Sequence, residues 1–477
     1  MVQKITPRSV DDSTWYTDIV QAADLADYSP VRGCMVIKPY GYAIWENMQQ
    51  YLDQRFKATG HQPAYFPLFI PQSFIQKEAD HIEGFAPQLA VVTHGGGEKL
   101  EEPLIVRPTS ETIINAMYAK WIRSYRDLPI LYYQWGNVVR WEMRTRLFLR
   151  TTEFLWHEGH TAHATAGQAM EEVMAILNIY RELAQNEMAM PVIPGRKSDS
   201  EKFAGADATW TIEAMMGNKW ALQAGTSHFL GQHFAKVFNI QFLDEANQLQ
   251  MVWQTSWAVT TRLVGALVMV HGDDQGLRLP PRMAPIQVVL VPIWKTDQER
   301  SQVMAVADKI KTDLGSHFRL HVDNREDLSP GFKFNDWEMR GVPLRIELGP
   351  KDVEKNQAVL ARRDVPARQN KCFVSLDSLV PEVRRLLDDI QRNLYAQALR
   401  FREENTFYPD DLEGLVEAVG KGFGVAYWCG SAECEDKIKE ATKGTIRCIP
   451  MDQEKKPGRC VICGQSAEEK AVIARSF

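Results

Sequence analysis

The segment VVRWEMRTRLFLRTTEFLWHEGH (Val138–His160) carries dense positive charge among aromatic and β-branched residues that are typical of a buried strand. Its arginines are Arg140, Arg144, Arg146 and Arg150. Burying a guanidinium without a partner is very costly. We therefore expect either that an anion binds between two β-rich arms, or that the arginines lie on a mobile loop at the turn between the arms.

Two of these arginines, Arg140 and Arg150, lie on opposite arms of the segment. If the arms pair as strands, both side chains can face one pocket, and arginine is suited to bidentate binding of phosphate or carboxylate. Phe154 offers a flat apolar face for a base. A solitary Arg262 near the start of the apolar run TTRLVGALVMVHG (260–272) also needs an anion. The alternatives are a surface hairpin with solvated arginines and an arginine that extends to the surface.

The segments around this hairpin predict a predominantly antiparallel sheet with helices. Tyr42–Thr59 has apolar residues at helical spacing, and Gly60 follows as a stop signal. Further strands are expected at 64–71, 103–111, 220–231 and 250–260. The proline-rich, non-periodic segment 276–285 is interpreted as a linker.

Strands and helices alternate beyond this linker, which predicts a compact α/β domain. Helical patterns and a cluster of cysteines follow it. The sequence therefore predicts an α+β chain with three domains, at 1–280, 285–395 and 396–477.

The composition is that of a soluble globular protein, because 45% of the 477 residues are hydrophobic and 24% are charged. The net charge of −6 indicates no general affinity for nucleic acid, so local clusters must bind any anionic ligand. No apolar run approaches the ~18 residues of a membrane span, and the first 25 residues contain no apolar signal segment. We expect a cytoplasmic protein without a membrane segment.

Five of the seven cysteines follow position 428. Cys429 and Cys434 have C-x4-C spacing, and Cys460 and Cys463 have C-x2-C spacing. Two such pairs are typical of a tetrahedral zinc site with four thiolates, which we expect to be structural. Two reduced thiol pairs without metal are the alternative. Cys448 could replace one ligand but lacks a close cysteine partner.

Several motifs together resemble a known family. RWEMRTRLFLRTTEF and TTRLVGAL resemble motifs 2 and 3 of the class II aminoacyl-tRNA synthetases, and YAIWENMQQYL with YFPLFIP resembles motif 1, their dimerisation element. RPTSE (107–111), FLWHEGH (154–160) and QAGTSH (223–228) resemble the archaeal/eukaryote-like prolyl-tRNA synthetases. The resemblance covers nearly the whole chain. It implies a class II catalytic domain, an α/β anticodon-binding domain, a small C-terminal zinc-binding α+β domain and a homodimer.

The resemblance also implies a reaction. ATP and L-proline would form prolyl-adenylate, and the prolyl group would pass to tRNA(Pro). Arg140 would contact the α-phosphate and the substrate carboxylate, and Arg262 the γ-phosphate, while Mg²⁺ arrives with ATP. The other ATP-binding residues would be Arg150, Thr151, Phe154, Gln223, Thr226 and Thr260.

A proline pocket must hold a secondary ammonium and a small apolar ring. By resemblance Glu111 and Thr109 would meet the ammonium, although RPTSE alone is also an ordinary helix cap. The rest of that pocket would be Arg140, Trp156, Glu158, His160, Phe203, His228 and Trp257. The residues expected to read the anticodon are Glu338, Arg345 and Lys351, for which ordinary surface charge is the alternative.

Two further expectations concern the tRNA end and the chain end. Arg144 and Arg146 would lie on a mobile loop that meets the tRNA acceptor end. The family often ends in tyrosine, whereas this chain ends in Phe477, so a role near the active site remains for a terminal carboxylate but not for a hydroxyl.

Two other functions stay open at this point. One is another class IIa synthetase, specific for threonine, glycine or histidine, although these do not share RPTSE with QAGTSH. The other is a non-catalytic class II-like tRNA-binding protein. Such a protein would be expected to lose the arginines of motif 2 or 3, whereas Arg140 and Arg262 are both present.

Overall fold

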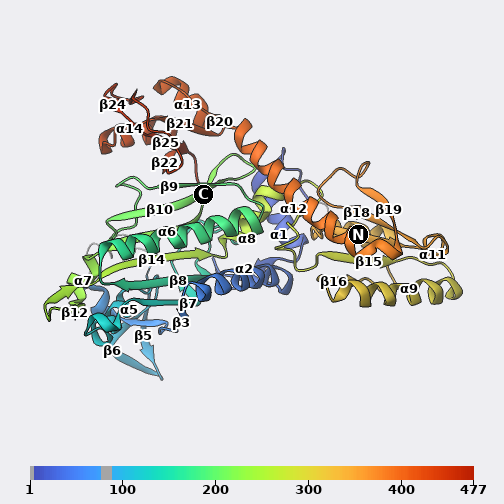
Figure 1. Cartoon of the computed structure of the whole chain (residues 1–477), viewed down its shortest axis with the longest axis horizontal. Helices are drawn as coiled ribbons and strands as arrows, with labels where there is room; N and C mark the ends of the chain where they lie inside the picture. The colour runs from blue at the N-terminus through green and yellow to red at the C-terminus, as the bar shows by residue number, and fades with distance from the viewer. Residues whose placement is uncertain (1–4, 77–88) are drawn as a thin grey trace.

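An eleven-stranded sheet runs through the computed structural model, which describes residues 5–76 and 89–477. Its central strands are antiparallel and carry the predicted hairpin and its neighbours (Figure 1). In spatial order these central strands are β9 (Val192–Arg196), β10 (Ala208–Met215), β11 (Ala221–Gly231), β14 (Trp253–Thr260), β8 (Glu153–His163) and β7 (Ile130–Val139). The short β3 (Gln62–Pro63) completes this edge, parallel to β7.

Helices cover the central strands and form the main core with them. Helix α6 (Ala166–Glu182) packs along β11 and β14. The others are α1 (Asp12–Ala22), α2 (Pro39–Ala58) and α8 (Arg262–His271). Helix α2 confirms the predicted helix, begins with Pro39 in its first turn, and buries Ile44, Trp45, Met48, Leu52 and Phe56. The predicted antiparallel sheet with helices is therefore confirmed.

Small elements border this catalytic unit. They are β1 (Ala26–Tyr28), β2 (Met35–Ile37), β4 (Phe69–Pro71), α3 (Gln72–Gln76), β5 (Ala90–Gly95), β6 (Glu98–Val106), α5 (Glu111–Trp121), α7 (His233–Phe238), β12 (Gln241–Leu243) and β13 (Leu249–Met251). The predicted strand 64–71 is largely wrong, because only Phe69–Pro71 forms a strand. Pro67 lacks an N–H for a ladder, and the Phe66 N–H donates to the Gln134 side chain at 2.9 Å instead.

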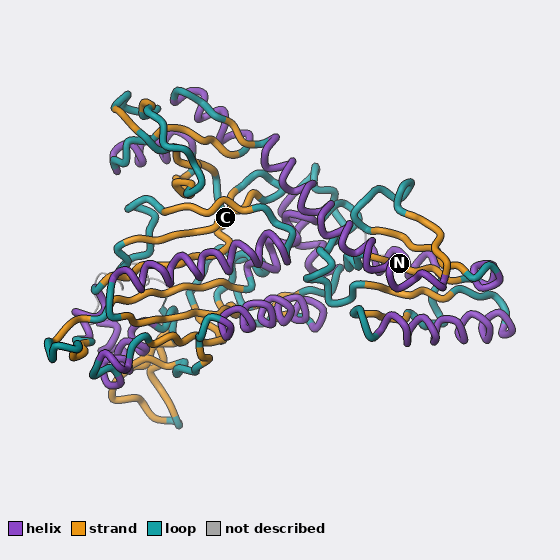
Figure 2. The backbone as a smooth tube through the Cα atoms, viewed as in Figure 1, coloured by secondary structure: helices purple, strands orange, loops and turns teal. Residues whose placement is uncertain are grey.

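The second unit contains a five-stranded sheet of the expected α/β kind. Its strands are β16 (Leu320–Val322), β15 (Val288–Pro292), β17 (Leu344–Leu348), β18 (Gln357–Arg362) and β19 (Lys371–Ser375). Its helices are α9 (Asp297–Gly315), α10 (Pro330–Met339), α11 (Pro350–Glu354) and α12 (Leu379–Glu404). Figure 2 shows the long α12 leading from this unit toward the C-terminal region. The predicted boundary at 395/396 falls inside α12, and the division into domains stays a prediction.

The segment 276–285 connects these two units but is not a loose linker. It has no helix or strand, as expected, yet Leu277, Leu279 and Met283 are buried in the main core. The segment therefore fixes one unit against the other.

The C-terminal region extends the central sheet, which the sequence did not indicate. It contains β20 (Thr406–Phe407), α13 (Leu412–Lys421), β21 (Phe423–Tyr427), α14 (Ala432–Thr442), β22 (Thr445–Pro450), β23 (Gly458–Arg459), β24 (Ser466–Ala467) and β25 (Lys470–Ala474). Strand β22 pairs with β9, with Ile449 opposite Arg196 and Pro450 opposite Gly195. A side chain at Gly195 would lie 2.7 Å from the Cβ of Cys448, so a glycine permits this close junction. Among the described residues, no helix combines the length and apolarity needed to cross a membrane.

We predict that Gly159→Ala disrupts the centre of the sheet. Gly159 on β8 lies opposite Trp257 on β14, and a Cβ at this position would overlap the indole. Such overpacking typically costs ~1–3 kcal/mol, measurable as a lower free energy of unfolding in urea. Gly167→Ala is the matched control, because it lies in α6 with only Thr165 within 4 Å and should change stability by less than ~1 kcal/mol. Equal effects of the two substitutions would contradict this packing.

Candidate active site

Every residue predicted for the ATP and proline sites lies at the wall of one cavity of about 460 Å³, to which strands β8, β11 and β14 contribute side chains. These residues are Thr109, Glu111, Arg140, Arg150, Thr151, Phe154, Trp156, Glu158, His160, Phe203, Gln223, Thr226, His228, Trp257, Thr260 and Arg262. The structure brings these residues together, and their roles toward a ligand remain predictions.

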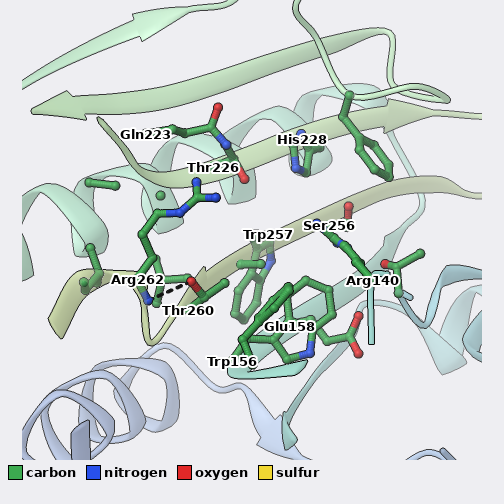
Figure 3. Close-up of a pocket in the computed structure, with 18 of the residues that line it drawn as sticks. Arg140, Trp156, Glu158, Gln223, Thr226, His228, Ser256, Trp257, Thr260 and Arg262 are labelled. Carbon is green, nitrogen blue, oxygen red and sulfur yellow. Dashed lines mark hydrogen bonds between the residues drawn. The ribbon is translucent and has the colours of Figure 1, made fainter. Parts of the chain in front are cut away.

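The strand register explains this convergence. On β8, Phe154, Trp156, Glu158 and His160 alternate with residues of the opposite face. His160 lies opposite Ser256 on β14, which in turn lies opposite His228 on β11. Figure 3 shows Gln223, Thr226 and Arg262 on one side of the cavity, and His228, Ser256 and Arg140 on the other. The cavity therefore has two ends with different side chains.

The two predicted catalytic arginines are fixed from behind by backbone carbonyls. Arg140 donates through Nε to the Pro108 carbonyl at 3.0 Å, and Arg262 donates through Nε to the Leu149 carbonyl at 3.1 Å. Burial lowers the pKa of both arginines, and the nearby charges of Arg140 and Arg150 contribute to lowering that of Arg262 to about 10. Buried positive charge of this density favours a polyanionic ligand such as a triphosphate.

The turn between the arms differs from the expected mobile loop. Arg144 is exposed, but the Arg146 guanidinium packs over the rings of Tyr16 at 4.6 Å and Phe477 at 5.6 Å. It also lies 3.8 Å from the Asp12 carboxylate. These contacts hold the turn against α1 and the last residue of the chain, and contact of Arg144 and Arg146 with tRNA stays a prediction.

The opposite end of the cavity contains a buried carboxylate network. Glu158 accepts hydrogen bonds from Ser110, from Gln134 at 2.7 Å and from His160 at 2.9 Å. Burial opposes a charged His160, yet its contact with Glu158 raises its pKa. Glu111 is 4% exposed and accepts a hydrogen bond from the Thr109 hydroxyl. This end therefore presents negative charge in a largely enclosed site.

Apolar and neutral side chains complete that end. The Phe203 and His228 rings lie 4.7 Å apart, and Thr209 contacts His228 Nδ1 at 2.9 Å. Burial lowers the pKa of His228 to about 4, so its imidazole is neutral at pH 7. Trp257 borders the cavity, but its ring is 1% exposed and packs 4.9 Å from that of Phe56. Trp257 therefore mainly packs behind the wall of the pocket, and little of its ring is exposed to the cavity.

Sequence reasoning missed several residues of the cavity wall. Ser256, Thr209, Glu201 and Glu142 line it without having been predicted. Ser256 could have been found, because it alternates with Ala258 and Thr260 on one strand. Glu142 forms a salt bridge with Arg150. Its place within the charged turn gave no signal in the sequence that it would line the cavity. Phe477 also lines the cavity, as expected for a residue near the active site.

The predicted anticodon residues lie on the α/β unit in different environments. Arg345 on β17 is only 7% exposed and forms salt bridges with Glu338 at 2.8 Å and with Glu347 at 2.9 Å. Its guanidinium also lies 4.2 Å from the Phe334 ring centroid. Lys351 is exposed on α11. Arg345 is therefore built into the sheet, which its sequence context did not reveal.

The four predicted zinc ligands meet in the C-terminal region. The sulfur atoms of Cys429, Cys434, Cys460 and Cys463 all lie within 4.8 Å of one another. Tetrahedral thiolates around zinc, with Zn–S distances of ~2.3 Å, have sulfur separations of roughly 3.8 Å, and Cys463 and Cys429 are 3.7 Å apart. Cys448 is buried in β22 outside this group. The donor set therefore fits zinc, with Cys448 as the spare cysteine.

Comparisons with known proteins agree with this organisation. Residues 94–271 match the tRNA synthetase class II core domain (G, H, P, S and T), residues 287–386 the anticodon binding domain, and residues 412–477 the C-terminal domain of prolyl-tRNA synthetase. The last match favours prolyl-tRNA synthetase over the threonine, glycine and histidine alternatives.

Full-length relatives narrow the family further. Proline–tRNA ligase of Roseiflexus sp. (strain RS-1) is 55% identical, covering 99% of both chains. That of Natranaerobius thermophilus is 55% identical, covering 100% of this chain and 98% of the relative. That of Chlorobium luteolum is 56% identical over the whole of both chains. With the class II core and four-cysteine cluster already in place, identity of this level and extent shows that the chain belongs to the proline–tRNA ligases, a family of aminoacyl-tRNA synthetases.

Proposed function

We propose that the cavity activates L-proline with ATP and passes the prolyl group to tRNA(Pro). The observation that carries this proposal is the meeting of two partly buried arginines, Arg140 and Arg262, with a buried carboxylate, Glu111, in one cavity. Such a site offers positive charge to the phosphates of ATP and negative charge to the ammonium group of proline. A non-catalytic tRNA-binding protein would not need this arrangement.

In the activation step, a carboxylate oxygen of proline attacks the α-phosphorus of ATP, and pyrophosphate leaves. Arg140 orients the carboxylate and neutralises charge on the α-phosphate, and Arg262 holds the γ-phosphate. Positioning and charge neutralisation suffice for such a transfer, because the protein forms no covalent bond to the substrates. Mg²⁺ bound to the triphosphate would neutralise further charge, and the Glu142 carboxylate at the cavity wall is a donor of the type it prefers.

Glu111 and Thr109 bind the secondary ammonium of proline. The apolar faces of Trp156 and Phe203 accommodate its ring, and the neutral His228 adds no charge that would repel the ammonium. Glu158 holds His160 in place through their 2.9 Å contact. The proposed specificity thus combines one negative charge with a small, largely apolar space.

The remaining proposals concern partners. The α/β unit reads the anticodon bases of tRNA(Pro) through Glu338, Arg345 and Lys351, with Arg345 pre-positioned by its carboxylate partners. Two chains form a homodimer, for which the exposed Tyr65, Phe69 and Trp121 near motif 1 supply apolar surface. ATP and tRNA as substrates make the cytoplasm the expected place of action.

Arg262→Ala and Arg140→Ala should each reduce proline-dependent ATP–pyrophosphate exchange by ~10²–10³-fold, because each removes a donor to charge that develops during transfer. Arg300→Ala is the control, because this arginine is half-exposed on α9 and pairs with Glu326. The control should keep normal exchange. Near-normal exchange in an Arg262→Ala protein with unchanged melting temperature would remove the proposed phosphate role.

Glu111→Gln should raise the KM for proline far more than the KM for ATP. The substitution keeps the size of the side chain but removes the negative charge that faces the ammonium. Glu201→Gln serves as the control, because Glu201 borders the same cavity without a proposed proline contact. Equal changes in both KM values would count against the assignment of this pocket.

We further propose one structural zinc ion per chain, held by Cys429, Cys434, Cys460 and Cys463. Binding only the folded form, the ion would stabilise the C-terminal region. Cys460→Ser should lose the metal, whereas Cys448→Ser should retain it, as measured by elemental analysis of purified protein. Less than half an equivalent of zinc in the unaltered protein, or full zinc in Cys460→Ser, would refute this site.

A further inference from the structure

A fully buried ionic cluster lies between the catalytic unit and the C-terminal region. At its centre Glu213 on β10 is 0% exposed. Its carboxylate accepts from Lys197 Nζ at 2.9 Å, from Arg447 Nε at 3.1 Å and from the Thr211 hydroxyl at 3.0 Å. These three groups thus direct donors at one carboxylate, and the cluster keeps one excess positive charge.

The three charges come from two parts of the chain. Lys197 directly follows β9, and Glu213 lies on the neighbouring β10 of the catalytic sheet. Arg447 lies on β22, which is the C-terminal strand that pairs with β9. Arg447 therefore carries a charge from the C-terminal region into the catalytic sheet.

The cluster lies beside the nucleotide end of the cavity. In the β10–β11 ladder Glu213 is opposite Gln223, and Thr211 is opposite Thr226. Opposite residues of antiparallel strands project from the same face of a sheet. Gln223 and Thr226 line the cavity beside Arg262 (Figure 3).

The charges of this cluster also act on the predicted phosphate-binding arginine. Beyond burial and the neighbouring arginines of the hairpin, Arg447 contributes to lowering the pKa of Arg262, whereas Glu213 opposes that shift. The cluster is therefore electrostatically coupled to the nucleotide end. The Glu111 carboxylate at the proline end lies on helix α5 and accepts a hydrogen bond from Thr109, outside this cluster.

We propose that Arg447 is a positioning residue of the nucleotide site, which acts by holding Glu213 beside Gln223, so that ATP binding depends on docking of the C-terminal region. This inference rests on the proposed function. Arg447 does not touch substrate in this account. It fixes the carboxylate that lies opposite Gln223 in the β10–β11 ladder and that balances the charge near Arg262.

The junction offers a matched control at a second buried contact. Ser198, the residue after Lys197, donates to the Glu435 carboxylate of α14 at 2.6 Å. Ser198→Ala loosens the same junction, yet neither Ser198 nor Glu435 lines the cavity. A purely structural role of Arg447 would make the two substitutions behave alike.

The test compares Arg447→Met and Ser198→Ala in the full-length, zinc-loaded enzyme by ATP–pyrophosphate exchange. Arg447→Met should raise the KM for ATP by about tenfold, a typical size for coupling between sites, and should leave the KM for proline within about twofold. Ser198→Ala should leave both values within about twofold. Arg447→Lys, which retains the charge and a donor, should restore much of the ATP affinity.

Several results would overturn the inference. An unchanged KM for ATP in folded Arg447→Met does so, as does an equal rise of the proline KM or an equal effect of Ser198→Ala. If Arg447→Met fails to fold, Arg447→Gln replaces it under the same criteria, because it keeps one donor for Glu213 without the charge. Absence of proline-dependent exchange in the unaltered enzyme would instead refute the proposed function, so the two failures are distinguishable.

Discussion

Buried positive charge at the cavity is the constraint on which the rest of the structure depends. Arg140 donates a hydrogen bond to the Pro108 carbonyl, and Arg262 donates one to the Leu149 carbonyl. Burial lowers the pKa of both guanidinium groups. Charge held in this way is costly unless a ligand compensates it. Arg140 directly follows β7 and Arg262 begins α8 just after β14, which places both arginines beside polar side chains of the cavity. We infer that burying these charges lowers the stability of the folded protein and makes the site complementary to a triphosphate.

The cavity is supported from several directions. Trp257 packs into the space above Gly159, Gln134 connects Glu158 to the backbone of Phe66, and Arg146 joins the hairpin turn to Phe477. Each contact links segments far apart in the sequence. The site is therefore a product of the whole catalytic unit, and the C-terminal region contributes to it through both Phe477 and the sheet junction.

Patterns local to the sequence predicted much of this arrangement. The hairpin arms, helix α2 and helix α8 follow from alternation, helical spacing and stop signals. The motifs indicated the residues of the substrate sites without any information on which residues lie close together in space. Contacts between distant segments could not be predicted in the same way. The pairing of β22 with β9 depends on Gly195 allowing close approach, and the salt bridges that bury Arg345 come partly from another element. The strand expected at 64–71 failed because Pro67 interrupts its hydrogen bonds.

The account is tested most directly by ATP–pyrophosphate exchange with each of the twenty amino acids supplied singly to the purified full-length protein. Because the cavity combines two partly buried arginines with the buried carboxylate of Glu111 and a small apolar space, exchange should depend on Mg²⁺-ATP and should be fastest with proline. Exchange driven best by threonine, glycine or histidine, or no exchange with any amino acid, would contradict it.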